Sequence, residues 1–214
     1  MFTAQVSQRR LAASGSGLPP GTTPVGSRGQ ILSEALRLFA EQGYGAASIR
    51  DIASRVGIKG ASLYSHYPSK AHVLAELIRI GHEEHFGRMR DALLAATPDV
   101  NEQLAAIVRA HVCAHADYPM LAVVSNSELH ALPEEFATPL LAIRRQSESL
   151  LLDVIQRGVN LGVFKVPDVS LAMMAIGAMG LRVAHWYTPE SGKTPAQIAD
   201  TYALFAARLL GVMT

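Results

Sequence analysis

The sequence has one cysteine, few aromatic residues and few charges for its length. Because Cys113 is the only cysteine, a disulfide framework within the chain and any site built from several thiolates are excluded. The longest apolar stretch, 171–181, is shorter than the roughly 18 residues that a membrane helix needs. The Arg9-Arg10 pair is not followed by the apolar core of a signal peptide. We therefore expect a cytoplasmic protein without a membrane-spanning helix.

The composition is that of a globular protein with an uneven distribution of charge. Of the 214 residues, 49% are hydrophobic and 17% are charged, which is enough for a sizeable core. The net charge of +1 combines +5 over residues 1–70 with −4 over residues 71–214. A basic N-terminal third on an acidic body is typical of a head that binds a polyanion such as nucleic acid.

The order of the segments predicts a two-part helical protein. Residues 14–27 are mostly Gly, Ser, Pro and Thr, so we expect a disordered arm over 1–27. Beyond it, apolar residues recur at helical spacing and alternating β-type runs are lacking, which predicts an all-α fold. The expected helices begin after Ser27 and Ser48 and continue at 59–67, 69–95, 101–117, 119–131, 134–161, 168–187 and 195–211. Capping boxes are expected at Ser27 with Gln30 and at Ser48 with Asp51.

Three residues between positions 53 and 63 have the spacing of a helix-turn-helix. Ala53 is small where the second helix must approach closely, Gly57 can adopt a positive φ at the turn, and Leu63 can fill the space between the helices. The outward face of the third helix then carries side chains that can hydrogen-bond: Lys59, Ser62, Tyr64, Ser65 and His66. In a helix-turn-helix this face enters the major groove of DNA, although the spacing alone also fits a plain helical hairpin.

The segment SIRDIASRVGIKGASLYSHYPSK at 48–70 resembles the DNA-binding signature of TetR-type transcriptional repressors. The preceding Ile31-Leu32, Ala35, Leu38-Phe39 and Gly43 resemble the first helix of that family. The resemblance implies a DNA-binding domain over 28–70 and an effector-binding and dimerisation domain over 71–214. It implies DNA contacts at Arg28, Ser48, Lys59, Gly60, Ala61, Ser62, Tyr64, His66 and Lys70. Ser65 departs from the pattern, because many relatives carry histidine or tyrosine there.

Segments of the body resemble a subgroup of the family that often senses acyl-CoA thioesters. They are NSELHALP at 126–133, Arg144-Arg145, DVIQRGVNLGVF at 153–164 and HWYTP at 185–189. The candidate effector-binding residues are Leu121, Val124, Glu128, Phe136, Leu140, Arg144, Arg145, Met173 and Met174. The apolar members can equally be core residues, and the arginines can form an ion pair with Glu128 instead of meeting an anionic effector.

The resemblance also implies that the last two helices form a homodimer. The expected helix 168–187 supports this independently, because it carries a broad apolar surface with small residues that let a partner helix approach. The candidate interface residues are Leu171, Met174, Ala175, Ala178 and Met179. We therefore expect a homodimer that binds double-stranded operator DNA and is released by a small apolar or acyl-CoA-type effector.

Two other functions were weighed. His111 and His115 are spaced i, i+4 like metal ligands, with Cys113 and Asp117 nearby, but Val112 stands where a zinc protease has its glutamate. His82 and His85 read as partly exposed helix residues, and Trp186 as a packing anchor. We accordingly expect no catalytic residues, no cofactor and no metal. The second alternative is an architectural DNA-binding protein without an effector, which a body of about 140 residues argues against.

Overall fold

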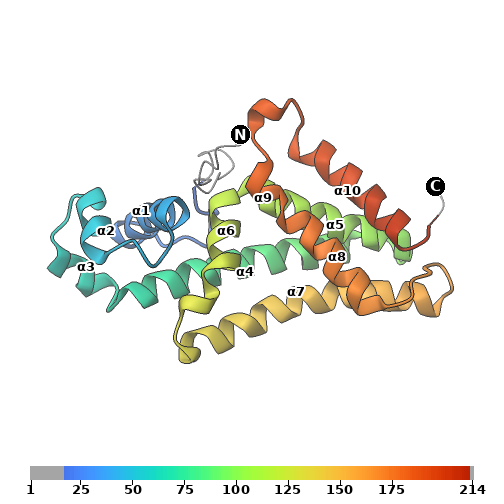
Figure 1. The fold of residues 1–214 in the computed structure, drawn as a ribbon, viewed down its shortest axis with the longest axis horizontal. Coiled ribbons are helices and arrows are strands. Elements are labelled where there is room, and N and C mark those ends of the chain that lie inside the picture. Colours follow the sequence, from blue (N-terminus) through green and yellow to red (C-terminus); the bar gives the residue numbers. More distant parts are fainter. Residues whose placement is uncertain (1–16, 213–214) are drawn as a thin grey trace, which may run out of the picture.

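The computed structural model describes residues 17–212, which form an elongated helical molecule (Figure 1). Every regular element within this range is a helix, which confirms the predicted all-α class. The α-helices are α1 (Ser27–Gln42), α2 (Ile49–Val56), α3 (Gly60–His66), α4 (Lys70–Ala95), α5 (Val100–Asp117), α6 (Pro119–Ser127), α7 (Glu134–Asn160), α8 (Val169–Leu181), α9 (Val183–Trp186) and α10 (Pro195–Leu209). Two 3₁₀ turns, η1 (Leu129–Ala131) and η2 (Pro189–Ser191), complete the chain.

Helix α1 begins differently from the expectation. Gly26 is its N-cap, with a φ of 70°, and the backbone N–H of Gln30 donates to the Gly26 carbonyl at 3.1 Å. Ser27 is therefore already inside the helix, and no side chain caps it, so the predicted Ser27 capping box is wrong. The physical reason is that glycine adopts positive φ without strain, which lets the helix start one residue earlier. The end at Gly43 is as predicted.

The predicted disordered arm lies mostly outside the described residues, since residues 1–16 are not among them. Between Gly17 and Gly26 the chain forms bends and turns. The Thr23 hydroxyl donates to the Pro19 carbonyl at 2.7 Å, and Leu18 packs against the core of the head. A hydrogen-bonded turn and an apolar anchor hold this Gly/Pro-rich segment against the head.

The head formed by α1–α3 and the helical body share an apolar core. One cluster of buried residues joins Phe39 of α1 and Leu63 of α3 to Leu74 of α4 and to Leu121 and Val124 of α6. A second cluster lies entirely in the body and joins α5, α7, α8 and α10. The predicted boundary at Lys70 coincides with the start of α4, but packing continues across it. Because close-packed interiors transmit displacements, a shift of α4 or α6 reaches the head.

The body is a layered helical bundle in which α8 and α10 form one outer side (Figure 1). The expected helix 168–187 is divided at Arg182 into α8 and α9. Residues 169–186 are long and apolar enough, by length and composition only, to cross a membrane, with a mean hydropathy of 1.3. This stretch is longer than the one identified in the sequence, because it includes α9. Only 28% of it is buried, so an apolar helix face is left uncovered in the monomer.

Candidate functional site

The head contains the turn that the sequence predicted. Helix α2 starts with the expected capping box, in which Ser48 and Asp51 each accept a backbone N–H from the other. Gly57 ends the helix in the left-handed region, with φ 77° and ψ 26°, and the N–H of Ile58 donates to the Ala53 carbonyl at 3.0 Å. Leu63 of α3 is fully buried. These contacts fix α2 and α3 as a helix-turn-helix.

Helix α3 lies at the tip of the head, and its outer face is open to solvent (Figure 1). Tyr64 is 54% exposed, although tyrosine usually buries much of its ring. The exposed residues of this face that were predicted to contact DNA are Lys59, Ala61, Ser62 and Tyr64, whereas Gly60, His66 and Ser48 are half-buried. The Ser65 hydroxyl donates to the Ser62 carbonyl at 2.7 Å.

Two of the predicted DNA contacts, Lys70 and Arg28, also have contacts within the protein. The Lys70 ammonium donates to the carbonyls of Tyr44 and Ala47, each at 2.7 Å, and lies 4.1 Å from the centre of the Tyr44 ring. Burial lowers the pKa of this ammonium. The Arg28 guanidinium stacks over Tyr67 at 4.7 Å. Lys70 therefore has one donor left for DNA, and its replacement would also weaken the link between α4 and the loop after α1.

The cations of the head differ in how far acidic neighbours neutralise them. Arg37 pairs with Glu34 at 3.0 Å and Arg55 with Glu41 at 2.9 Å, so these two arginines are partly neutralised. Lys59 makes no ion pair with any residue between 17 and 212. Its exposed ammonium at the start of α3 is available for a phosphate group.

Replacing Ser62 by alanine should reduce sequence specificity. If its hydroxyl reads a base edge, the variant loses about 1 to 3 kcal/mol on an operator selected from random DNA and little on random duplex. Fluorescence anisotropy on both duplexes measures the difference, with Ser149→Ala on the exposed side of α7 as the control. An equal loss on both duplexes would assign Ser62 to the phosphate backbone.

A cavity of about 440 Å³ lies in the body between α4, α5, α6, α7 and α8. Its apolar wall includes Met89, Leu121, Leu151, Met173 and Met174. Volumes of about 300 to 1,000 Å³ and mostly apolar walls are typical of small-molecule sites. The flexible methionines can adapt to different ligand shapes.

The cavity contains four of the nine predicted effector-binding residues: Leu121, Arg144, Met173 and Met174. The other five do not line it. Val124 and Leu140 belong to the core shared with the head, and Phe136 packs on the edge of the His72 ring, with ring centres 4.9 Å apart. Glu128 is buried at the end of α6, and Arg145 is exposed on the outer side of α7. These residues lie on the same helices but point in other directions.

Polar groups of the cavity come mainly from residues that the sequence analysis named but did not assign to the effector site. His82 and His85 of α4 line it together with His111 and His115 of α5. Burial lowers the pKa of His82 to about 4 and that of His115 to about 3, so both are neutral near pH 7. The sequence signal that could have found them is the same in α4 and α5: two histidines, spaced i, i+3 or i, i+4, on a largely apolar helix.

Of the four residues of the metallohydrolase hypothesis, His111 and His115 lie together at the cavity wall, but Asp117 and Cys113 do not join them. Asp117 accepts from Arg88 at 2.6 Å, and Cys113 does not line the cavity. Burial raises the pKa of the Cys113 thiol, which makes it a poor nucleophile. Arg144 donates to Glu148 at 3.0 Å.

The uncovered apolar face of the body includes most of the predicted dimer residues. Leu171 is 61% exposed and Met174 is 53% exposed on α8, with Ala175 and Ala178 exposed beside them. Met179 is partly buried and packs against the body core, and its place in the interface stays a prediction. The face continues on α9 and α10 with Trp186, Leu204, Phe205 and Leu209. Ala178 and Met174 also line the cavity.

Head and body together define a class: a helix-turn-helix DNA-binding protein with a ligand cavity in a helical body. The comparisons with known proteins agree. Residues 31–77 match "Bacterial regulatory proteins, tetR family", and residues 97–210 match "Tetracyclin repressor-like, C-terminal domain". The chain belongs to the TetR family of transcriptional regulators.

The similarity to known proteins covers most of the chain. The HTH-type transcriptional repressor KstR2 of Rhodococcus jostii is 30% identical over 83% of this chain and 87% of its own length. The structure of the ketosteroid transcriptional regulator KstR2 of Mycobacterium tuberculosis has a TM-score of 0.79 and 28% identity, covering 89% of this chain and 97% of that one. AibR, solved with isovaleryl coenzyme A and operator DNA, shares the fold with a TM-score of 0.75 and 21% identity over 86% of this chain and 97% of its own.

Proposed function

We propose that this protein is a ligand-responsive repressor that binds operator DNA as a homodimer and is released when an effector fills the cavity. Two α3 helices, one from each protomer, enter successive major grooves of the operator. The cavity binds its ligand without turnover, and DNA as the partner implies a cytoplasmic location.

One observation carries this proposal: two helices that line the cavity, α4 and α6, also pack against the head. Leu121 of α6 lines the cavity and is also a member of the core that holds the head. Helix α4 starts at Lys70, directly after the helix-turn-helix, and lines the cavity from Gly81 to Met89. A ligand that moves either helix therefore moves the head. Recognition helices must stand about 34 to 36 Å apart to enter successive grooves, so the dimer's DNA affinity responds to that movement.

The contact between α4 and α6 is especially tight at Gly81. A Cβ atom at this position would lie 2.9 Å from Cβ and Oγ of Ser125. Both residues line the cavity, so a ligand there presses directly on this helix crossing. The sequence analysis did not identify α6 as a connection between ligand and DNA.

We propose an acyl-CoA thioester with an apolar acyl group as the effector. The apolar walls suit a hydrocarbon chain or ring, and the relatives include a ketosteroid regulator and a protein solved with an acyl-CoA. Two buried atoms of lining residues, His82 Nε2 and Ser147 Oγ, have no hydrogen-bond partner within residues 17–212. A buried polar group without a partner costs free energy, so a ligand carbonyl or hydroxyl that satisfies one of them would gain affinity.

The exposed face of α8 and α10 is the proposed dimer interface. Its apolar side chains explain the hydropathy of residues 169–186 without a membrane. Because Met174 and Ala178 belong both to this face and to the cavity wall, the partner protomer covers one side of the site.

Native mass spectrometry of the full chain with a panel of acyl-CoA thioesters tests the proposal. We expect a dimer that binds at least one thioester and, when mixed with a selected operator, releases the DNA as the ligand is added. Free coenzyme A is the control, because it has no acyl group to fill the cavity. A dimer that binds DNA but none of the panel, with no shift in melting temperature, would favour the architectural alternative.

A further inference from the structure

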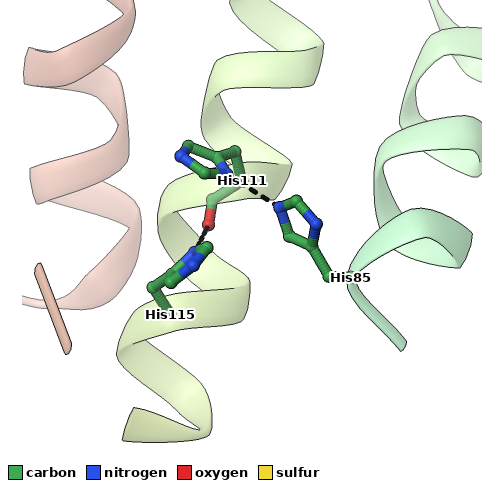
Figure 2. Close-up of side chains that lie close together, drawn as sticks. All are labelled: His85, His111 and His115. Carbon is green, nitrogen blue, oxygen red and sulfur yellow. Dashed lines mark hydrogen bonds between the residues drawn. The ribbon is translucent and has the colours of Figure 1, made fainter. Parts of the chain in front are cut away.

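Three histidines meet at one wall of the cavity. His85 projects from α4 toward His111 and His115 of α5, and one ring nitrogen of each lies within 4.8 Å of the other two (Figure 2). His85 Nε2 is 2.7 Å from His111 Nδ1. His111 and His115 are buried, and His85 is half-buried at the cavity wall.

Hydrogen bonds to backbone carbonyls set the tautomers of the two α5 histidines. His111 Nε2 lies 3.0 Å from the Gly177 carbonyl of α8, and a carbonyl can only accept, so Nε2 carries the proton and Nδ1 has a lone pair. His115 Nδ1 likewise donates to the His111 carbonyl at 2.7 Å, which leaves Nε2 with a lone pair. Metal-ligating histidines are typically oriented by such a bond from the second nitrogen.

The histidines are kept neutral, as metal ligands must be. Burial is the main cause that lowers the pKa of all three, and mutual repulsion lowers it further for His85 and His115. Within residues 17–212, no carboxylate is among the groups that shift the pKa of these three rings. In this arrangement His85 Nε2–H donates to His111 Nδ1. When a metal ion binds, His85 can carry its proton on Nδ1 instead, which leaves a lone pair on His85 Nε2.

We propose that His85, His111 and His115 form a binding site for a divalent transition-metal ion of the Zn²⁺, Co²⁺ or Ni²⁺ class. Imidazole nitrogen is a ligand that these ions prefer, and three ligands leave a position open toward the cavity. Tetrahedral Zn²⁺ at about 2.0 to 2.1 Å from each nitrogen requires ligand nitrogens roughly 3.4 Å apart. The His85 and His111 nitrogens, now 2.7 Å apart, must therefore move apart, and the nitrogens that lie up to 4.8 Å apart must approach each other.

This site departs from the expectation of a metal-free chain. That expectation weighed His111 and His115 with Cys113 and Asp117 and treated His85 separately, because nothing in the sequence pairs His85 with His111 across 26 residues. The proposed ion stands in the effector cavity, where its open position can bind a carboxylate or carbonyl oxygen of a ligand, or water. The site does not depend on DNA binding or on an acyl-CoA effector.

Two glycines of α8 provide a matched pair of variants. A Cβ atom at Gly180 would lie 2.1 Å from His111 Cδ2 and 2.3 Å from His111 Nε2, so Gly180→Ala displaces this ring. A Cβ atom at Gly177 meets nothing within 4 Å, so Gly177→Ala leaves the ring and its carbonyl partner in place. Both changes add a methyl group to the same helix.

Titration of chelator-treated full-length protein with Co²⁺, followed by calorimetry and by the visible absorption of tetrahedral Co²⁺, tests the site. We expect one ion per chain. Gly180→Ala and His115→Gln should each weaken binding by at least the roughly 10- to 100-fold that loss of an outer-shell partner causes. Gly177→Ala, which keeps the carbonyl, and His130→Gln, at an exposed position of η1, should bind as the unaltered protein does.

Circular dichroism melting of every variant shows that the fold is retained. The proposal is overturned if the unaltered protein binds no Co²⁺, or if folded Gly180→Ala and His115→Gln retain its affinity and spectrum. The proposal is also overturned if Gly177→Ala weakens Co²⁺ binding as much as Gly180→Ala does. Since DNA and acyl-CoA are absent from the titration, these outcomes leave the repressor proposal untouched.

Discussion

Replacing Ala175 and Phe205 by arginine is expected to convert the dimer into a monomer. Both side chains are exposed on the apolar face of α8 and α10, and each new guanidinium would lose its hydration against a partner without gaining a counter-charge. A monomer reaches only one operator half-site, so affinity should fall toward non-specific binding, by on the order of 10³-fold or more. Analytical ultracentrifugation and operator titration measure the two effects.

The control for this variant is Leu94→Arg. Leu94 is 76% exposed at the far end of α4 and lies outside the proposed interface. This change adds the same charge to an exposed apolar position and should leave the dimer intact. If the double variant of Ala175 and Phe205 still sediments as a dimer of unchanged affinity, the interface lies elsewhere on the body.

Filling the cavity should produce a repressor that no longer responds to its effector. Ala122 of α6 lines the cavity, and a phenyl group at this position would occupy part of the volume that the ligand fills. The unaltered dimer should lose about 5- to 150-fold in operator affinity when the effector binds, as is typical of coupled sites. Ala122→Phe should keep its operator affinity whether or not effector is added, which electrophoretic mobility shift assays can measure.

A matched change outside the cavity is Ala142→Phe. Ala142 is exposed on α7, so the added ring meets solvent and the effector response should be normal. If Ala122→Phe is released from the operator as readily as the unaltered protein, the effector occupies another site. Its melting temperature reports whether the added ring strains the core, at a cost of about 1 to 3 kcal/mol where space is short.

The helix-turn-helix could be predicted from sequence because it is specified locally. The three residues that specify it, Ala53, Gly57 and Leu63, lie within eleven residues of one another. Each meets one steric requirement that few residue types satisfy: small size, a positive φ, or a side chain that fills the space between the helices. The same holds for the Ser48 capping box, which depends on contacts three residues apart. Lys70 shows the limit, since its bonds to Tyr44 and Ala47 cross more than twenty residues.

The cavity could not be predicted in detail because its walls come from five helices. A stripe of Leu and Met indicates the buried side of a helix but not whether a neighbouring side chain fills the space beside it. Leu121 and Val124 are both core residues of α6, but only Leu121 also lines the cavity. The cluster of His85, His111 and His115 could not be predicted for the same reason. Only the packing of α4 against α5 brings His85 beside His111.

The central claim is that effector and operator DNA compete through α4 and α6, and calorimetry in both directions tests it most directly. The thioester identified by native mass spectrometry is titrated into free dimer and into operator-bound dimer, and the operator is titrated into free and thioester-bound dimer. Linkage requires the two ratios of affinities to be equal, and we expect a factor of about 5 to 150. An effector that binds equally well to free and operator-bound dimer would contradict the account.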